Sequence, residues 1–196
     1  MRERNGSMRY EILFFGMPRV ASTSLNAALE GKVDIVGHAE LDVARSIIRR
    51  YKTSFCFVRN PIDRFLSAYI YHKFNKSPHL KDQETTKYMG KYRSPDEMAL
   101  DIHNFIRECP FTVHYIPQSR WVYDRGEKIV THVLSYERLE EDFDFICKKL
   151  GISAVLGERR WNNSVKEKPS LSREARECLF KFYRDDFNNF GYKEES

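Results

Sequence analysis

The sequence has no apolar run near the length of about 20 residues that a membrane-spanning helix requires. It also has no internal repeat and no segment with the composition of a domain linker, and residues 1–9 are charged and polar, unlike a secretory signal peptide. We therefore expect one domain over residues 1–196, with residues 1–9 flexible. The expected location is soluble and cytoplasmic, unless the chain is an excised luminal domain.

Cysteine is scarce, with four residues and no C-x-x-C pair. Cys56 lies inside an apolar run and Cys147 on the apolar face of a predicted helix, so both are expected to be reduced core residues. No pair of cysteines or histidines has the spacing typical of zinc ligands, and the sequence therefore predicts no metal site.

Positive charge is only in modest excess, with 33 Lys and Arg residues against 28 Asp and Glu residues and a net charge of +5. No block of Lys and Arg is dense enough to indicate nucleic acid, so no nucleic-acid partner is expected. The excess is compatible with an anionic ligand, and a solvated basic surface explains it as well. The apolar content of 41% is typical of a globular chain.

Short apolar runs alternate with helical patterns along the chain. Because such alternation is typical of parallel sheets covered on both faces, the sequence predicts an α/β fold, with three α/β/α layers and a central, mostly parallel sheet. Ligands of such folds bind at the carboxyl ends of the strands. The polar segment 75–92 is expected to be a long loop or irregular insertion. The predicted strands are 12–15, 33–36, 54–58 and 129–134, and the predicted helices are 24–29, 41–51, 62–74, 95–107, 139–150 and 172–187.

The segment 16–24 joins the first predicted strand to the first predicted helix. Backbone N–H groups and the helix dipole converge on an anion at such a junction. The hydroxyls of Ser22, Thr23 and Ser24 add donors and Arg19 adds a positive charge, so the pattern predicts a phosphate-like ligand. An ordinary connection capped by Ser22 or Thr23 is the alternative. The segment lacks the second glycine and the lysine of G-x-x-x-x-G-K-(S/T), which indicates chemistry other than ATP hydrolysis.

A second segment of this kind begins at Arg59, where another predicted strand ends. Asn60 is a good helix cap and Pro61 suits the first helical position. Ser67 lies off the apolar stripe of that helix, so Arg59 and Ser67 are expected to face one anion at the sheet edge. The alternative is that Arg59 pairs with a carboxylate such as Asp63.

The two segments, in this order, resemble the sulfotransferases that use 3′-phosphoadenosine 5′-phosphosulfate (PAPS). Residues 18–24 resemble their 5′-phosphosulfate loop, P-K-(T/V)-(A/G)-(S/T)-T-(S/T), and residues 58–69 match V-R-(N/D)-P-x-x-R-x-x-S-x-Y at every fixed position. Arg19 stands where most members have lysine. The resemblance implies a P-loop-like fold and one sulfotransferase domain, and it is closest to the carbohydrate sulfotransferases and their small bacterial relatives.

Later segments extend the resemblance over about residues 12–192. They are similar to the mid-chain P-Q element, the strand-ending Y-E-x-L element and the closing Y-x-x-D and F-G-Y elements of the family. Trp121 and Trp161 are expected to pack in the core or in a loop, with stacking on adenine or a sugar as the alternative. The matching residues are Pro117-Gln118, 135–139, 182–187 and 190–192.

The resemblance implies in-line, metal-independent transfer of a sulfuryl group from PAPS to a hydroxyl or amine of a small-molecule or carbohydrate-like acceptor, which leaves 3′-phosphoadenosine 5′-phosphate (PAP). Arg19 would be catalytic and would bind the donor. Arg59 and Ser67 would hold the 3′-phosphate. The 5′-phosphosulfate would contact Arg19, Val20, Ala21, Ser22, Thr23 and Ser24.

His38 is the predicted general base, because the family often has a histidine after the second strand and an imidazole pKa suits the task. A capping role for His38 and a carboxylate base, Glu40, are the alternatives. Two other functions stay open at this point. One is a non-catalytic protein that binds a nucleotide or polyanion, and the other is a P-loop-type kinase. The sequence does not predict the oligomeric state.

Overall fold

Four parallel strands form the central sheet, in the order β2-β1-β3-β6. The computed structural model describes residues 11–37, 39, 41–74, 77–157 and 169–193. The strands β1 and β3 are buried along almost their whole length, which explains why their sequences are mostly apolar. The predicted α/β class with a parallel sheet is confirmed. The strands are β1 (Ile12–Gly16), β2 (Asp34–Gly37), β3 (Thr53–Val58) and β6 (His132–Ser135).

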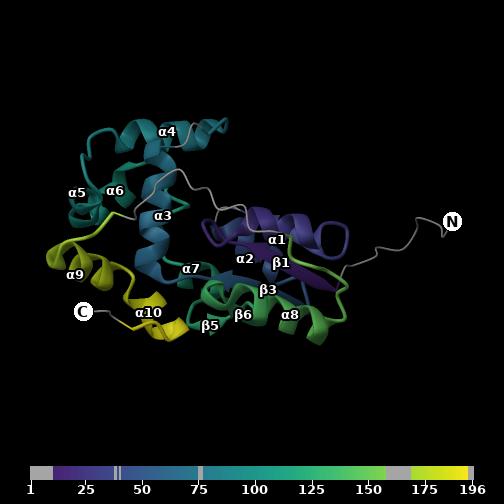
Figure 1. Ribbon diagram of the computed structural model, residues 1–196. Helices are drawn as coiled ribbons and strands as arrows, with labels where there is room; N and C mark the ends of the chain where they lie inside the picture. Colours follow the sequence, from purple (N-terminus) through teal and green to yellow (C-terminus); the bar gives the residue numbers. More distant parts are fainter. Residues whose placement is uncertain (1–10, 38, 40, 75–76, 158–168, 194–196) are drawn as a thin grey trace.

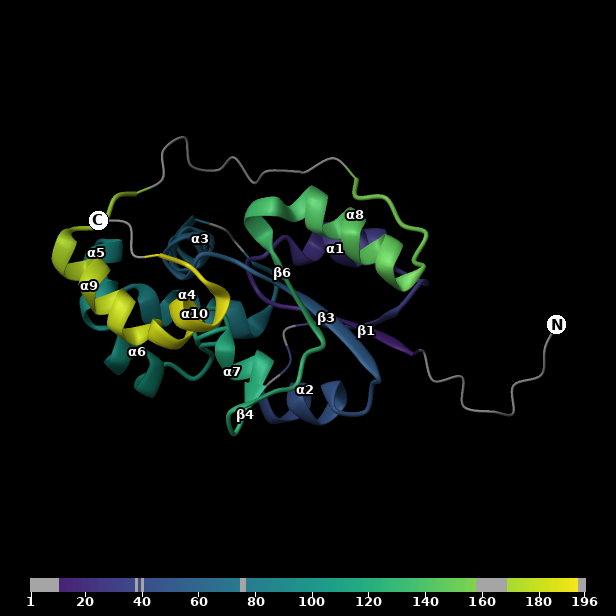
Figure 2. The same cartoon turned by 90° about the horizontal axis from the view of Figure 1, so that it is seen from below.

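Helices cover both faces of this sheet. Figure 2 shows α1 (Ser22–Leu29) and α8 (Leu139–Leu150) over one face, with α2 (Leu41–Ile48) and α7 (Ser119–Val122) over the other. This is the arrangement that right-handed crossovers between parallel strands produce. Trp121 on α7 is fully buried in the sheet core, so the core interpretation of this residue holds.

A second group of helices stands beside the carboxyl ends of the strands (Figure 1). Its hydrophobic cluster is separate from the sheet core and includes Phe65, Phe105, Tyr115 and Tyr183. The sequence did not predict this second cluster. The group consists of α3 (Pro61–Phe74), α4 (Leu80–Met89), α5 (Pro95–Leu100), α6 (Ile102–Glu108), α9 (Arg173–Phe182) and α10 (Arg184–Phe190).

The prediction of a loop over residues 75–92 is wrong, because α4 lies within that segment. The buried positions of α4 are Asp82, Thr85 and Met89, and two of these three are polar. The helix therefore has no apolar stripe that a sequence pattern could detect. Figure 1 shows α4 against the upper part of α3.

Several predicted elements have different bounds in the structure. The predicted helices 95–107 and 172–187 are each divided in two, at Asp101 and at Tyr183, where the backbone leaves the helical region. A hairpin of β4 (Tyr123–Asp124) and β5 (Glu127–Lys128) precedes β6, and a short 3-10 helix, η1 (Tyr136–Arg138), follows it. None of the described helices is long and apolar enough to span a membrane.

Candidate active site

The connection between β1 and α1 has an unusual backbone. Arg19 (φ 68°) and Ala21 (φ 60°) both adopt the left-handed conformation, which is uncommon for residues other than glycine and costs about 1–3 kcal/mol each. The N-cap of α1 is Ala21, and no side chain in the described part of the chain caps the helix. The alternative of a connection capped by Ser22 or Thr23 is therefore wrong. The first turn of α1 is left available to an anion.

The structure brings Arg19, Arg59 and Ser67 together from two distant segments. Arg19 donates from Nε and Nη2 to Ser67 Oγ at 3.2 and 3.1 Å. Arg59 donates from Nη1 to the carbonyl oxygen of Arg19 at 3.3 Å. The two arginine segments thus meet at the carboxyl ends of the adjacent strands β1 and β3, where Arg19 bonds both Ser67 and Arg59.

Each guanidinium group lies over an aromatic ring. The Arg19 guanidinium lies 4.5 Å from the ring centre of Tyr71, and that of Arg59 lies 4.5 Å from the ring centre of Tyr136. Arg59 is only 9% exposed, and its Nε is buried without a hydrogen-bond partner among the described residues. Burial lowers the pKa of Arg19, although an arginine remains charged at neutral pH. The described surroundings therefore leave two adjacent positive charges that suit an anion.

Gln118 holds the backbone of Arg59. Its Oε1 accepts from the Arg59 N–H at 2.9 Å, and its Nε2 donates to the Arg59 carbonyl oxygen at 2.8 Å. The carboxylate of Asp186 accepts from the backbone N–H groups of Gln118 and Ser119 at 2.8 and 2.7 Å. Burial raises the pKa of Asp186, whereas the charge of Arg64 and these N–H donors lower it. The P-Q and Y-x-x-D elements thus hold the Arg59 backbone in place, but they do not face the two guanidinium groups.

Asn60 anchors the peptide that follows Arg59. Its Oδ1 accepts from the N–H groups of Ile62 and Asp63 at 3.0 and 3.2 Å, which confirms the predicted cap of α3. The N–H of Asn60 donates to Glu137 Oε1 at 2.8 Å, and Glu137 Oε2 accepts from the Tyr192 hydroxyl at 2.8 Å. The Y-E-x-L and F-G-Y elements therefore meet at the same peptide. The motif resemblance located these residues, but nothing in the sequence indicated their partners.

Arg64, the second arginine of the same motif, has a different role. It is fully buried and donates to the carbonyl oxygens of His114 and Ile116, the first at 3.1 Å. Its guanidinium carbon lies 5.9 Å from the ring centre of Tyr183. It therefore fixes the segment that leads into Pro117 and does not face the anion site.

A buried polar cluster lies on the other side of Tyr71. The Tyr71 hydroxyl donates to Asp82 Oδ2 at 2.7 Å, and His72 Nε2 is 3.3 Å from His114 Nδ1. Burial lowers the pKa of His72 to about 4, so its imidazole is neutral at physiological pH. Burial also raises the pKa of Tyr71, so its hydroxyl keeps its proton. The sequence did not indicate this cluster, because its members are distant from one another along the chain.

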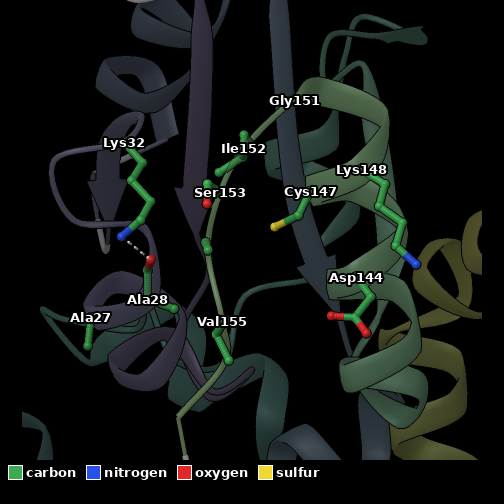
Figure 3. Close-up of a pocket in the computed structure, with 11 residues that line it drawn as sticks. Ala27, Ala28, Lys32, Asp144, Cys147, Lys148, Gly151, Ile152, Ser153 and Val155 are labelled. Atoms are coloured by element: carbon green, nitrogen blue, oxygen red, sulfur yellow. Dashed lines mark hydrogen bonds between the residues drawn. The ribbon is translucent and has the colours of Figure 1, made fainter.

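A groove of about 520 Å³ lies between α1 and α8 (Figure 3). Lys32 crosses one side of it and donates to the carbonyl oxygen of Ala28 at 3.0 Å, while Asp144 and Lys148 line the other side. None of the residues that line the groove belongs to either motif segment. The groove is therefore separate from the arginine site.

Several predicted residues lie outside the part of the chain that the structure describes. These are both candidate bases, His38 and Glu40, together with Trp161 and residues 1–9. Their proposed roles stay predictions. Of the loop residues, Val20 is buried, Ala21, Ser22 and Ser24 are half-buried, and Thr23 is exposed.

No significant match to the chain is found among curated proteins or among solved structures. A family model described as "Sulfotransferase family" matches residues 6–193, nearly the whole chain. The match includes both arginine segments and the later residues that hold Arg59. It agrees with the resemblance of the two motifs and with the parallel sheet from which they emerge. The chain therefore belongs to the sulfotransferase family.

Proposed function

We propose that the chain transfers a sulfuryl group from PAPS to a hydroxyl or amine of a small, carbohydrate-like acceptor, without a metal ion in the reaction. Family membership supports a sulfotransferase role. The observation that carries the finer proposal is the juxtaposition of Arg19, Arg59 and Ser67 beside the uncapped start of α1. Two adjacent guanidinium groups suit a donor that has phosphate groups at two positions.

The residues fit such a donor. Among the described residues the buried Nε of Arg59 has no hydrogen-bond partner, and residues 19–24 include the first turn of α1. Arg59 and Ser67 would hold the 3′-phosphate. Arg19 and the loop residues Val20, Ala21, Ser22, Thr23 and Ser24 would hold the 5′-phosphosulfate.

When bound, PAPS supplies the sulfuryl group: a bond forms from the acceptor oxygen or nitrogen to sulfur, and the bond from sulfur to the 5′-phosphate oxygen breaks. Arg19 stabilises the negative charge that develops on the leaving phosphate oxygen. It supplies charge and two forked donors but no proton, because arginine stays protonated. His38, or Glu40 in its place, accepts the proton of the attacking group. Orientation and charge stabilisation supply most of the rate in such in-line transfers.

Calorimetric titration with PAP in the absence of magnesium tests the proposal. We expect the wild-type chain to bind PAP, and we expect Arg59→Ala to weaken binding about 10- to 100-fold, since a hydrogen bond to a charged group is worth about 1.5–3 kcal/mol. Arg173→Ala is the matched control, because the Arg173 side chain is 88% exposed on α9 and pairs with Glu177 there. This variant should bind PAP like the wild type.

Absence of PAP binding by the folded wild-type chain would overturn the proposal. If PAP binds, the transfer of the ³⁵S-labelled sulfuryl group from PAPS to a panel of sugar and amine acceptors, with a parallel assay of phosphoryl transfer from ATP, separates the remaining alternatives. PAP binding without transfer to any acceptor indicates a binding protein that does not turn over. A phosphoryl transfer that requires magnesium indicates a kinase.

A further inference from the structure

Two imidazoles and one carboxylate meet in the interior beside α3. His72 lies near the end of α3, Asp82 on α4, and His114 in the segment between α6 and α7. Their exposed fractions are 1%, 8% and 5%, respectively. Buried polar groups of this kind need hydrogen bonds or a bound ion to offset the loss of hydration.

The three ligand atoms have nearly the spacing of a metal site. His72 Nε2, His114 Nδ1 and a carboxylate oxygen of Asp82 all lie within 4.8 Å of one another. The two nitrogens are 3.3 Å apart, and His114 Nδ1 is 3.9 Å from Asp82 Oδ1. Bonds of about 2.0–2.1 Å in a tetrahedron place two ligand nitrogens about 3.3 Å apart. The imidazoles therefore already have the required separation, and the carboxylate needs to approach the two nitrogens by at most about 1.5 Å.

One of the two carboxylate oxygens of Asp82, Oδ2, is held in place by hydrogen bonds. Asp82 Oδ2 accepts from the hydroxyls of Tyr71 and Ser77, each at 2.7 Å. Oδ1 is the oxygen that lies nearer to the His114 imidazole. A ligating carboxylate is oriented in the same way by outer hydrogen bonds in established metal sites.

We propose that His72, Asp82 and His114 bind one divalent transition-metal ion, with zinc as the ion that this site takes. Two imidazole nitrogens and one carboxylate oxygen suit zinc and disfavour magnesium and calcium, which prefer oxygen ligands alone. Three protein ligands leave a fourth position for a water molecule. The ion would join α3, α4 and the segment before α7, and the Tyr71 side chain would stand between it and the Arg19 guanidinium. The spacing argument from sequence did not detect this set, because its members are not neighbours along the chain.

The test uses the untagged full chain after removal of metal with a chelator. Zinc titration should give one equivalent of tight binding and a higher melting temperature, since an ion that binds only the folded state stabilises it. Cobalt(II) should give the intense visible d–d bands of a tetrahedral site. His72→Ala and Asp82→Asn should each lower the affinity at least about 10-fold, because the first removes a ligand and the second replaces a charged ligand with a neutral one. His103→Ala, an exposed histidine on α6, should leave both readouts unchanged.

Octahedral cobalt spectra in the wild-type chain, or zinc binding that Asp82→Asn and His72→Ala leave unchanged, would overturn the proposal. The cluster would then be a hydrogen-bonded network only. The wild-type cobalt spectrum does not depend on whether any variant folds, so the test stays decisive if a substitution prevents folding. None of these readouts involves PAP, so failure here is distinct from failure of the proposed function.

Discussion

Gln118 illustrates how the site depends on residues that do not face it. Its side chain spans the N–H and the carbonyl of Arg59, and its own backbone is held by Asp186. The sequence predicted that Arg59 and Ser67 belong to one site and that Asn60 caps α3, because these features are local. It could not predict the partners of Gln118 or of Glu137, since these contacts join segments that are far apart along the chain.

Replacing Gln118 with alanine should destabilise the chain by about 2–4 kcal/mol, because the buried N–H and C=O of Arg59 would both lose their partners and each costs about 1–3 kcal/mol. Urea unfolding followed by circular dichroism measures this change. Gln83→Ala is the control, because Gln83 is exposed and makes one surface hydrogen bond. A loss below about 0.5 kcal/mol for Gln118→Ala, the usual range of surface substitutions, would contradict the role assigned to this side chain.

At the scale of helices and strands, apolar pattern determined what the sequence could predict. The strands β1 and β3 were predicted within one residue at each end because they are nearly continuous apolar runs, and the helix α8 because its buried positions are mostly apolar at the helical period. The helix α4 was missed because it buries Asp82 and Thr85. The divisions at Asp101 and Tyr183 were missed as well, since the apolar pattern continues across them.

The end of α8 permits a clean test of one backbone conformation. Gly151 has φ 67°, and the N–H of Ile152 donates to the carbonyl oxygen of Cys147 at 2.8 Å, as in a Schellman motif. A Cβ at Gly151 would meet no atom within 4 Å, so Gly151→Ala should cost about 1 kcal/mol from the left-handed conformation alone.

Gly157→Ala is the matched control for this substitution. A Cβ at Gly157 also meets nothing within 4 Å, but its φ is not in the left-handed region, so its free energy of unfolding should stay within about 0.5 kcal/mol of wild type. Chemical denaturation of both variants gives the comparison. Equal stability of the two variants would show that the conformation of Gly151 contributes nothing.

At the scale of the whole molecule, the sheet core and the second hydrophobic cluster meet where the guanidinium groups of Arg19 and Arg59 lie. Arg59 follows a strand of the sheet core, and Ser67 lies on α3 among the residues of the second cluster. The α/β class followed from the sequence, because strands and helices alternate. The second cluster did not, since its helices are short and its members are contributed by segments as distant as residues 65 and 187.

The four cysteines report on the integrity of both clusters. Cys56 and Cys147 belong to the sheet core and Cys109 to the second cluster, all three buried, while Cys178 on α9 is half-exposed. Burial raises the pKa of Cys56 to about 12, which removes the reactive thiolate near neutral pH. With a disulfide reagent such as DTNB at pH 8, we expect Cys178 to react fast and the other three more slowly by about 10³-fold or more, because they require opening.

Cys178→Ser should abolish the fast phase, and denaturant should make all the thiols react at similar rates. A second fast thiol in the Cys178→Ser variant would contradict the packing of the cluster that contains it. If that thiol is Cys109, the second cluster opens independently of the sheet. If it is Cys56 or Cys147, the sheet core itself is open.

The hydrogen bond between Asp186 on α10 and the Gln118 N–H at the start of α7 also affects the order in which the site forms during synthesis. Synthesis releases the chain from its amino end, so Arg19, Arg59 and Ser67 leave the ribosome long before Asp186. A nascent chain that has exposed only the sheet therefore carries both cations without the carboxylate that holds Gln118 beneath Arg59. Asp186 can bond Gln118 only when α10 has docked, so the support of Arg59 is completed at the end of folding.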